Sequence, residues 1–291
     1  RIGDNRMAGK LKITTGGDAP TLNGQLQAPT LDVAALRAAW PESGQETTEI
    51  SLPVLPALRG ELDLSVERLT LEQGVVEDIH SRITLAEHTL SLDSVSFAIA
   101  DSHVEAEASL TSRPDTLAAE ARLTLQNLSQ NTLDIPLGPD DRLDAELAFE
   151  LQPIEQRPTF ERETLLANLR IANSRFSYRN ETAGSDLEAR LETRGEGEPP
   201  GLFLGLSGTL TGKPLEMELR GGPLTDLVNL ETGAWQHDYR FEAEATSGGL
   251  HARVDTRLAS LLQPSTLEGE VMLDADSGRA LEAWIGPILP P

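Results

Sequence analysis

The side chains best suited to metal binding or acid–base chemistry are scattered along this 291-residue chain. The five histidines are His80, His88, His103, His237 and His251. No His-x-His pair and no Glu-bearing helix of the kind that holds zinc accompanies them. We therefore expect no metal site, and we interpret the histidines as exposed strand residues.

Motifs for nucleophilic and phosphate chemistry are also missing from the sequence. The tetrapeptide TGKP at 211–214 ends in proline where a phosphate-binding loop has Ser or Thr. The chain has no Gly-x-Ser-x-Gly elbow and no cysteine. Its 47 acidic residues fall mostly on polar positions of alternating runs, and no pair stands out as a general acid–base couple. We expect a protein that is not an enzyme and needs no cofactor.

The net charge of −23 limits the partners. It argues against a nucleic-acid partner, because phosphates require Lys and Arg for neutralisation. It also argues against electrostatic docking on an anionic lipid surface. No run of 18 apolar residues is present, so no membrane-spanning helix is expected. The absence of cysteine is compatible with the bacterial periplasm.

Alternation of apolar and polar residues is the dominant pattern, and it predicts the elements that would position any site. The stretch HVEAEASLTSRPDTLAAEARLTLQ (103–126) contains two alternating runs joined at Arg113-Pro114-Asp115. Period two around a Pro-Asp turn predicts a β-hairpin with one apolar and one polar face. The apolar positions are Val104, Ala106, Ala108, Leu110, Leu117, Ala119, Ala121, Leu123 and Leu125.

Similar runs along nearly the whole chain predict about 16–18 strands. We expect them to pair sequentially and antiparallel, since no long crossover is visible. Apolar residues at helical spacing predict four short helices, at 31–40, 224–230, 256–263 and 277–286. Residues Leu165, Ala167, Leu169 and Ile171 alternate after an irregular patch at 152–163.

Composition also predicts a division of the chain. Polar stretches with Pro and Gly at 41–53 and 193–201 are expected to be linkers. They separate a β segment with a short helix at 1–40, a curled antiparallel β-sheet module at 54–192, and a second β segment with short helices at 202–291.

The predicted sheet needs something to cover its apolar side. Open twisted sheets rarely exceed about ten strands without curling or splitting. A β-sandwich, a closed barrel or a strongly curled open sheet would each solve this. The chain is poor in aromatic residues, with 6 Phe, 3 Trp and 2 Tyr, and its apolar positions are rich in Ala. Such a composition suits a trough for a flexible apolar guest, although a sandwich core would use the same positions.

Several stretches resemble the AsmA family of bacterial envelope proteins (AsmA/TamB-like). TLNGQLQAPTLDVAAL (21–36) matches a recurring strand that ends in Leu-Asp and a short Leu/Ala helix. Residues 58–110 resemble the module of short alternating strands, although Asp101-Ser102-His103-Val104 stands where the family has a Gly return. SGTLTGKPLEMELRGGPLTDL (207–227) resembles a Gly-x-Pro-Leu strand–turn–helix element, and WIGPILPP (284–291) a connection between units.

This resemblance implies a location and a function. Members of the family are anchored by one inner-membrane helix and extend into the periplasm, where a curled β-groove carries phospholipid toward the outer membrane. The chain would be an interior fragment of the periplasmic part, with its inner-membrane anchor outside this sequence. Implied partners are phospholipid or another acyl-chain lipid and, at the ends, outer-membrane or envelope proteins.

Our hypothesis is an all-β, long, strongly curled antiparallel sheet that forms an open apolar groove, with a few short helices capping or plugging it. The groove would hold acyl chains for transport between the inner and outer membranes. The expected lipid-binding residues are Val104, Ala106, Ala108, Leu110, Leu117, Ala119, Leu123, Leu143, Leu147 and Phe149. The alternative is a non-catalytic structural or adaptor β module that supports outer-membrane protein assembly.

Overall fold

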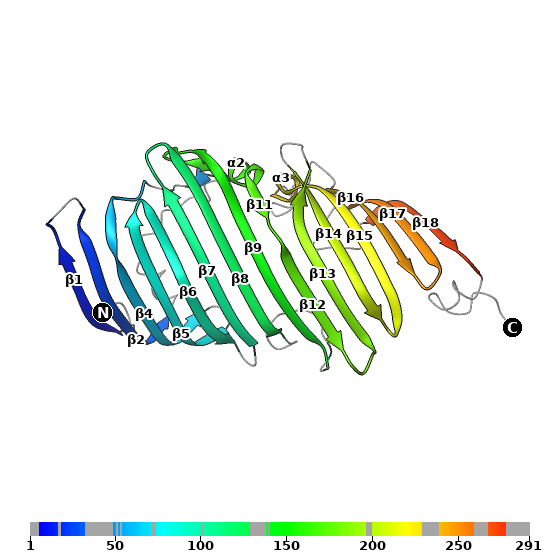
Figure 1. The fold of residues 1–291 in the computed structure, drawn as a ribbon, viewed down its shortest axis with the longest axis horizontal. Helices are drawn as coiled ribbons and strands as arrows, with labels where there is room; N and C mark the ends of the chain where they lie inside the picture. Colours follow the sequence, from blue (N-terminus) through cyan, green and yellow to red (C-terminus); the bar gives the residue numbers. More distant parts are fainter. Residues whose placement is uncertain are drawn as a thin grey trace. The chain divides into compact units, whose positions relative to one another are not determined.

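The fold is all-β in the computed structural model (Figure 1), as the alternation predicts. Among the described residues lie eighteen strands and two short helices. The structure describes residues 6–16, 19–32, 49–50, 52, 54–71, 74–99, 102–128, 138, 140–195, 200–228, 239–258 and 267–277.

Sixteen of the strands that the structure describes belong to one large sheet, which is mostly antiparallel and is not closed. Its two end strands are β1 (Arg6–Thr14) and β18 (Leu267–Ala275). This confirms the expected open antiparallel sheet. Contacts divide the chain into two compact units, one formed by Arg1–Pro139 with Asp144–Asn168 and the other by Asp140–Leu143 with Leu169–Pro291.

The first unit consists almost entirely of long strands in sequence order. After β1 these are β2 (Thr21–Asp32), β4 (Leu58–Leu71), β5 (Gly74–Glu87), β6 (Thr89–Ile99), β7 (Ser102–Ser112), β8 (Thr116–Leu128) and most of β9 (Arg142–Glu155). Two short strands, β3 (Glu49–Ile50) and β10 (Phe160–Glu161), form a separate antiparallel pair. A helix, α2 (Arg162–Ala167), follows β10 directly.

The second unit repeats this plan. Its elements are β11 (Leu169–Ile171), β12 (Ser174–Asn180), β13 (Ser185–Arg194), β14 (Gly201–Leu210), β15 (Lys213–Pro223), α3 (Leu224–Val228), β16 (Tyr239–Ser247), β17 (Leu250–Leu258) and β18. From β12 to β18 each strand pairs antiparallel with the next. The predicted Ser247-Gly248-Gly249 turn joins β16 and β17, and both glycines have the positive φ that such a turn favours.

The predicted hairpin at 103–126 is confirmed. β7 and β8 pair antiparallel, with Ala106 opposite Leu123 and Leu110 opposite Ala119. The backbone N–H of Arg113 donates to the carbonyl of Thr116 at 2.9 Å and closes the turn around Pro114. Because one face of the hairpin is apolar, a register slip by one residue would move that set to the other face.

One pairing contradicts the expected antiparallel order. β2 and β4 run parallel, with Leu22 opposite Gly60 and Ala28 opposite Val66. Parallel neighbours need a connection of a dozen or more residues, and the stretch 33–57 separates these two strands. Gly60 suits the pairing, because it has φ +147° and a Cβ on it would lie 1.7 Å from the carbonyl oxygen of Leu22.

The short helices are confirmed in one case and corrected in others. α3 confirms the helix expected at 224–230 over the residues described. The expected helix at 256–263 is wrong at its start, because Thr256 lies in β17 opposite Phe241 and is 4% exposed. Leu31 and Asp32 likewise end β2 instead of beginning a helix. The remainder of the helices expected at 31–40, 256–263 and 277–286 lies almost entirely outside the described residues.

The segment around α2 also differs from prediction. Leu165 and Ala167 were expected in a strand, but both belong to α2. Their alternation is interrupted by Leu166, which places two leucines side by side in the sequence and suits a helix better than a one-sided strand. Leu169 and Ile171 do lie in a strand, β11.

Residues 41–48 of the expected linker 41–53 lie outside the described residues. In the expected linker 193–201, Thr193 and Arg194 are the last residues of β13.

One buried cluster of the first unit consists of Ala28, Val66, Val76 and Ile79, near the β4–β5 turn. Other buried apolar residues of this unit lie outside the cluster: Val104, Leu117, Leu128, Ala145 and Phe160. Partly buried neighbours pack against the cluster: Leu31, Leu64, Leu69, Val95 and Phe97. This cluster involves β2, β4, β5 and β6, and the apolar positions of the other strands are considered next.

Candidate functional site: one face of the sheet

Rows of residues directly opposite one another cross seven strands of the first unit. The first row is Leu11, Gly24, Leu62, Ile83, Leu92, Ala108 and Ala121. The second row is Ile13, Leu22, Gly60, Leu85, Leu90, Leu110 and Ala119. Directly opposed residues of paired strands share a face. We call this side of each unit the aliphatic face.

No residue of these two rows is buried. Most are half-buried, and at the β1 end Leu11 is 55% and Ile13 67% exposed. The inner face of a sandwich would be sealed by a second sheet about 10 Å away, and its central side chains would be buried. The chain therefore covers the middle of this face incompletely.

The segment that contains Leu52 and Leu55, here called the closing segment, is hydrogen-bonded to residues at the strand ends on one end of the face. The backbone N–H of Leu55 donates to the carbonyl of Ser112 at 3.1 Å, and the carbonyl of Leu55 lies 2.6 Å from Nδ1 of His88. Nε2 of Gln156 donates to the carbonyl of Leu52 at 2.7 Å. Ser112 is 0% exposed at this end. The segment thus ties together the ends of β5, β7 and β9.

The predicted lining residues of β7 and β8 share the aliphatic face. Ala106 lies opposite Leu123, Leu110 lies opposite Ala119, and Val104 and Ala108 have the same phase along β7. Val104 and Leu117 are covered by protein, at 3% and 0% exposure. The other members of this group are half-buried: Ala106, Ala108, Leu110, Ala119 and Leu123.

The three predicted residues of β9 alternate on one side of that strand. Leu143, Leu147 and Phe149 are half-buried, and Ala145, of the same phase, is 5% exposed. Leu147 and Phe149 belong to the first unit, whereas Leu143 belongs to the second.

The second unit has an aliphatic face that the predicted lining almost entirely missed. One row across seven strands is Phe176, Ala189, Leu206, Met217, Ala245, Ala252 and Leu273. All are half-buried except Leu273, which is 52% exposed on the end strand. The signal for these positions was present, because the same alternation runs through β12–β18.

Buried serines mark several strand ends on this face, and sequence reasoning overlooked them. Ser102 begins β7 at 2% exposure, and its hydroxyl donates to the carbonyl of Asn127 at 3.0 Å. Ser185 begins β13, and its Oγ accepts from the backbone N–H of Thr211 at 3.1 Å. Ser247 ends β16 and donates to the carbonyl of Pro214. The available signal was a small polar residue in the apolar phase, next to a turn.

The opposite face carries cross-strand ion pairs. Arg82 lies 3.1 Å from Asp63, and Arg240 lies 2.8 Å from Asp255. These side chains are about half exposed, so solvent screens each pair and its contribution to stability is small. We interpret this polar face as the solvated side of the sheet.

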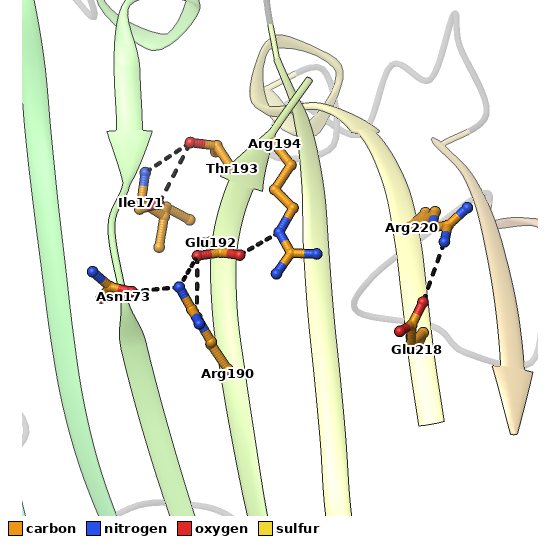
Figure 2. Close-up of polar contacts among 8 residues, drawn as sticks. All are labelled: Ile171, Asn173, Arg190, Glu192, Thr193, Arg194, Glu218 and Arg220. Carbon is orange, nitrogen blue, oxygen red and sulfur yellow. Dashed lines mark hydrogen bonds and ion pairs between the residues drawn. The ribbon is translucent and has the colours of Figure 1, made fainter. Parts of the chain in front are cut away.

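Glu192 is the most enclosed carboxylate of these ion pairs (Figure 2). It lies in β13 with its side chain 13% exposed, 2.8 Å from the guanidinium of Arg190 and bonded to Nε of Arg194. Burial acts to raise its pKa, but the hydrogen bonds and charges of the two arginines prevail and lower it. Asn173 accepts from Arg190 at 2.6 Å, and Arg194 stacks over Phe203 at 3.5 Å. A carboxylate held ionised in this way is a structural anchor and a poor proton donor.

A second anchor joins the start of β9 to the β12–β13 hairpin within the second unit. The carboxylate of Asp141 accepts from the hydroxyl of Tyr178 at 2.8 Å and from the amide of Asn180 at 2.5 Å. The hydrogen bond to Asp141, with burial as a further cause, raises the pKa of Tyr178. Both partners stabilise the ionised carboxylate, so this cluster also holds structure in place.

The histidines do not assemble a site. His80 and His103 are exposed on β5 and β7, His251 is exposed on β17, and His88 binds the closing segment. His237 lies outside the described residues. No group of three or more His, Cys, Asp or Glu in the described part of the chain could hold a metal ion.

Comparison of the chain with protein-family models, with curated proteins and with solved structures found no match. The described residues include no helix with the length and apolar character needed to cross a membrane. The resemblance to the AsmA family therefore stays a prediction, and the functional argument depends on the aliphatic face itself.

Proposed function

We propose that the chain binds the acyl chains of a phospholipid, or of another lipid, along the aliphatic face and carries them between the inner and outer membranes. The observation that carries this proposal is the incomplete cover of that face. Rows of Leu, Ile and Ala cross seven strands of the first unit without one buried member. A contiguous apolar surface that the chain itself covers only in part supports a binding role.

In this proposal each unit's sheet curls about its aliphatic face, so that the face becomes the floor of an open groove. Sheets of many strands twist and curl as they grow, which supports such a shape. Acyl chains would lie on Leu62, Ile83 and Leu92, while the headgroup stays in water. The closing segment at Leu52 and Leu55 would cap one end of the groove.

The energetics suit transport. Burying a methylene gains about 0.8 kcal/mol, so a chain of sixteen carbons gains at most about 13 kcal/mol before the cost of ordering it. The half-buried side chains of the face cover only part of the acyl chain, so the free energy gained by burying it is smaller than this limit. Because apolar contact has no directional bonds, a lipid could slide from one row of residues to the next.

The small residues have a role in the proposal. Ala106, Ala108, Ala119 and Ala121 lie together on β7 and β8. In this proposal their small side chains leave room for the lipid above the sheet. A packed core would fill this space with larger side chains. The functional residues are thus the alternate residues of each strand that lie on the aliphatic face, and we propose no catalytic group.

We place this function in the periplasm, within a protein anchored in the inner membrane, as the resemblance implies. Lipid is the proposed ligand, with envelope or outer-membrane proteins as partners at the ends of the path.

An adaptor module is the second candidate. It is favoured by Val104 and Leu117, which the chain itself covers. If the remainder of the face were sealed in the same way, no lipid could bind, and the sheet would act as a scaffold for outer-membrane protein assembly.

Site-specific photocrosslinking separates the two candidates. The photoreactive residue p-benzoylphenylalanine would replace Leu123, which is half-buried on the aliphatic face, or the adjacent Arg122, whose side chain is 61% exposed on the polar face. Each variant would be illuminated with vesicles of phosphatidylethanolamine and phosphatidylglycerol, and intact-protein mass spectrometry would detect adducts.

We expect a phospholipid adduct at position 123 and none at position 122. Equal adducts at both positions would indicate nonspecific contact with the vesicle surface. No adduct at either position, together with a lipid-free folded protein in native mass spectrometry, would favour the adaptor.

A further inference from the structure

The two end strands of the sheet each have one outer edge without a described partner strand. β1 and β18 stand first and last in the strand order, and no strand that the structure describes pairs with the outer edge of either. Such edges present a row of backbone N–H and C=O groups that can accept another strand. Natural proteins often protect such edges with charged side chains, and here exposed apolar residues accompany the charges, since Ile13 is 67% and Val271 62% exposed.

The polar side of β1 is basic. Lys10 lies opposite Gln25 and Lys12 opposite Asn23, and both lysines are exposed. The chain has three lysines in all, the third being Lys213. In a protein with a net charge of −23, two of the three lysines are therefore on one edge strand.

The polar side of β18 is acidic. Glu270 lies opposite Asp255 and Asp274 opposite His251, and both carboxylates are exposed. Met272, 61% exposed, lies between them on the same side. The outer edge of β18 thus has the opposite charge to that of β1.

We propose that β1 of one copy pairs with β18 of a second copy and extends the sheet from one molecule to the next. Both strands alternate strictly over these residues. In either strand direction, a register that places Leu11 and Ile13 beside the aliphatic positions of β18 also places the lysines beside its acidic side. Diagonal neighbours on paired strands are still within reach of long side chains, so Lys10 and Lys12 can both reach carboxylates.

The contact joins two different surfaces, so it leaves a free β1 at one end of the pair and a free β18 at the other. Further copies can add to these ends. The aliphatic faces of successive copies would then be continuous across each junction. This inference stands on the edges alone and does not require the lipid proposal.

Sedimentation velocity of the full chain, from low to high micromolar concentration, tests the proposal. We expect the weight-average mass to rise with concentration and the association to weaken as salt increases. The variant K10E/K12E makes both edges acidic, and E270K/D274K makes both edges basic. Each variant alone should associate at least about tenfold more weakly than the wild type, because like charges then face each other.

Mixing the two variants supplies the decisive result. The acidic β1 of one variant can pair with the basic β18 of the other, so the mixture should recover the association that each variant lost. The control R157E/R220E changes the net charge as much as K10E/K12E, at exposed positions away from both edges, and should associate as the wild type does at equal salt.

Hydrogen exchange supplies a second measurement. Backbone amides of β1 and β18 should gain protection at high concentration, while those of β7 should not change. A wild-type chain that stays monomeric throughout, or a mixture that fails to recover association while both variants are folded, would overturn the proposal.

Discussion

Two alanines on the aliphatic face allow a direct test of whether that face is sealed. Ala28 in β2 is 1% exposed and belongs to the buried cluster with Val66, Val76 and Ile79. Ala108 in β7 is half-buried and lies between Leu92 and Ala121 in its row. Replacing each by isoleucine adds the same three carbons to the same secondary structure.

The structure predicts opposite effects on the free energy of unfolding. At position 28 the added carbons enter a closed cluster, and overpacking of this kind costs about 1–3 kcal/mol. At position 108 the carbons extend above an incompletely covered face, where the higher strand preference of isoleucine contributes up to about 1 kcal/mol of stability. We expect the free energies of unfolding of the two variants to differ by about 1–4 kcal/mol.

Urea unfolding followed by circular dichroism measures this difference. Both positions lie in the first unit, so both variants report on the same compact body. If Ala108→Ile destabilises the protein as much as Ala28→Ile, the middle of the face is sealed, and the argument for a lipid on it fails. A neutral or stabilising Ala108→Ile, with a costly Ala28→Ile, would support an accessible face.

Three further predictions test the supports of the sheet. Gly60→Ala should lower the free energy of unfolding in urea by about 3 kcal/mol, because the added Cβ meets Leu22 at a strained φ. Gly16→Ala, where a Cβ has nothing within 4 Å, should lower it little. Equal costs would contradict the parallel pairing. Urea titrations at several pH values should show that the wild type is more stable than Glu192→Gln. This advantage should be full above pH 4.5, the ordinary pKa of glutamate, and should decline as the pH falls through the lowered pKa of Glu192. An advantage that grows on acidification would refute this account. Burial, with the charge of Asp226, raises the pKa of Tyr239 to about 12, and the hydrogen bond to Asp141 raises the pKa of Tyr178. Absorbance at pH 10 should therefore show less phenolate in the folded protein than after urea is added. The stability due to the neutral phenol of Tyr239 is lost as the pH rises from 10 toward 12.

The strands could be predicted because one-sided contact imposes a period of two on the sequence. β7 and β8 show this well, since Glu105, Glu107 and Arg122 fall on the polar side while their neighbours fall on the aliphatic side. The turn at Pro114 was equally legible, because proline and aspartate suit turn positions. Which residues share a face follows from parity alone wherever no bulge intervenes.

Strand order and strand ends were less accessible. Nothing in the alternation of β2 or β4 distinguishes a parallel from an antiparallel neighbour, because both pairings preserve parity. The sequence feature that marks the parallel pair is Gly60, and the need for glycine at this position is evident only when Leu22 is known to lie beside it. Thr256, a β-branched polar residue, continues strand β17 opposite Phe241 and is 4% exposed, although the local spacing favoured a helix.

The candidate site was predicted in kind but not in extent. The expected residues were concentrated in β7, β8 and β9, whereas the aliphatic face continues through β12–β18 in the second unit. The two residues of that prediction that the chain covers, Val104 and Leu117, are near strand ends, where Ser102 and Ser112 are also buried. Sequence parity assigns a residue to a face, but only the tertiary fold decides which part of that face is covered.

An incompletely covered apolar face has a physical cost that the polar face cannot offset. The cross-strand pairs such as Arg82–Asp63 are exposed and contribute little, so they do not explain why the sheet folds with Leu62 and Ile83 only partly buried. The ladder hydrogen bonds between strands, the cluster around Val66 and the closure at Leu55 hold the frame together without sealing its centre. A selected sequence could have filled that centre with large side chains, but it has alanine at positions 106, 108, 119 and 121. Under our proposal, this space is kept free for a lipid at the expense of stability, so the alanines of β7 and β8 support the proposal together with the incomplete cover of the face.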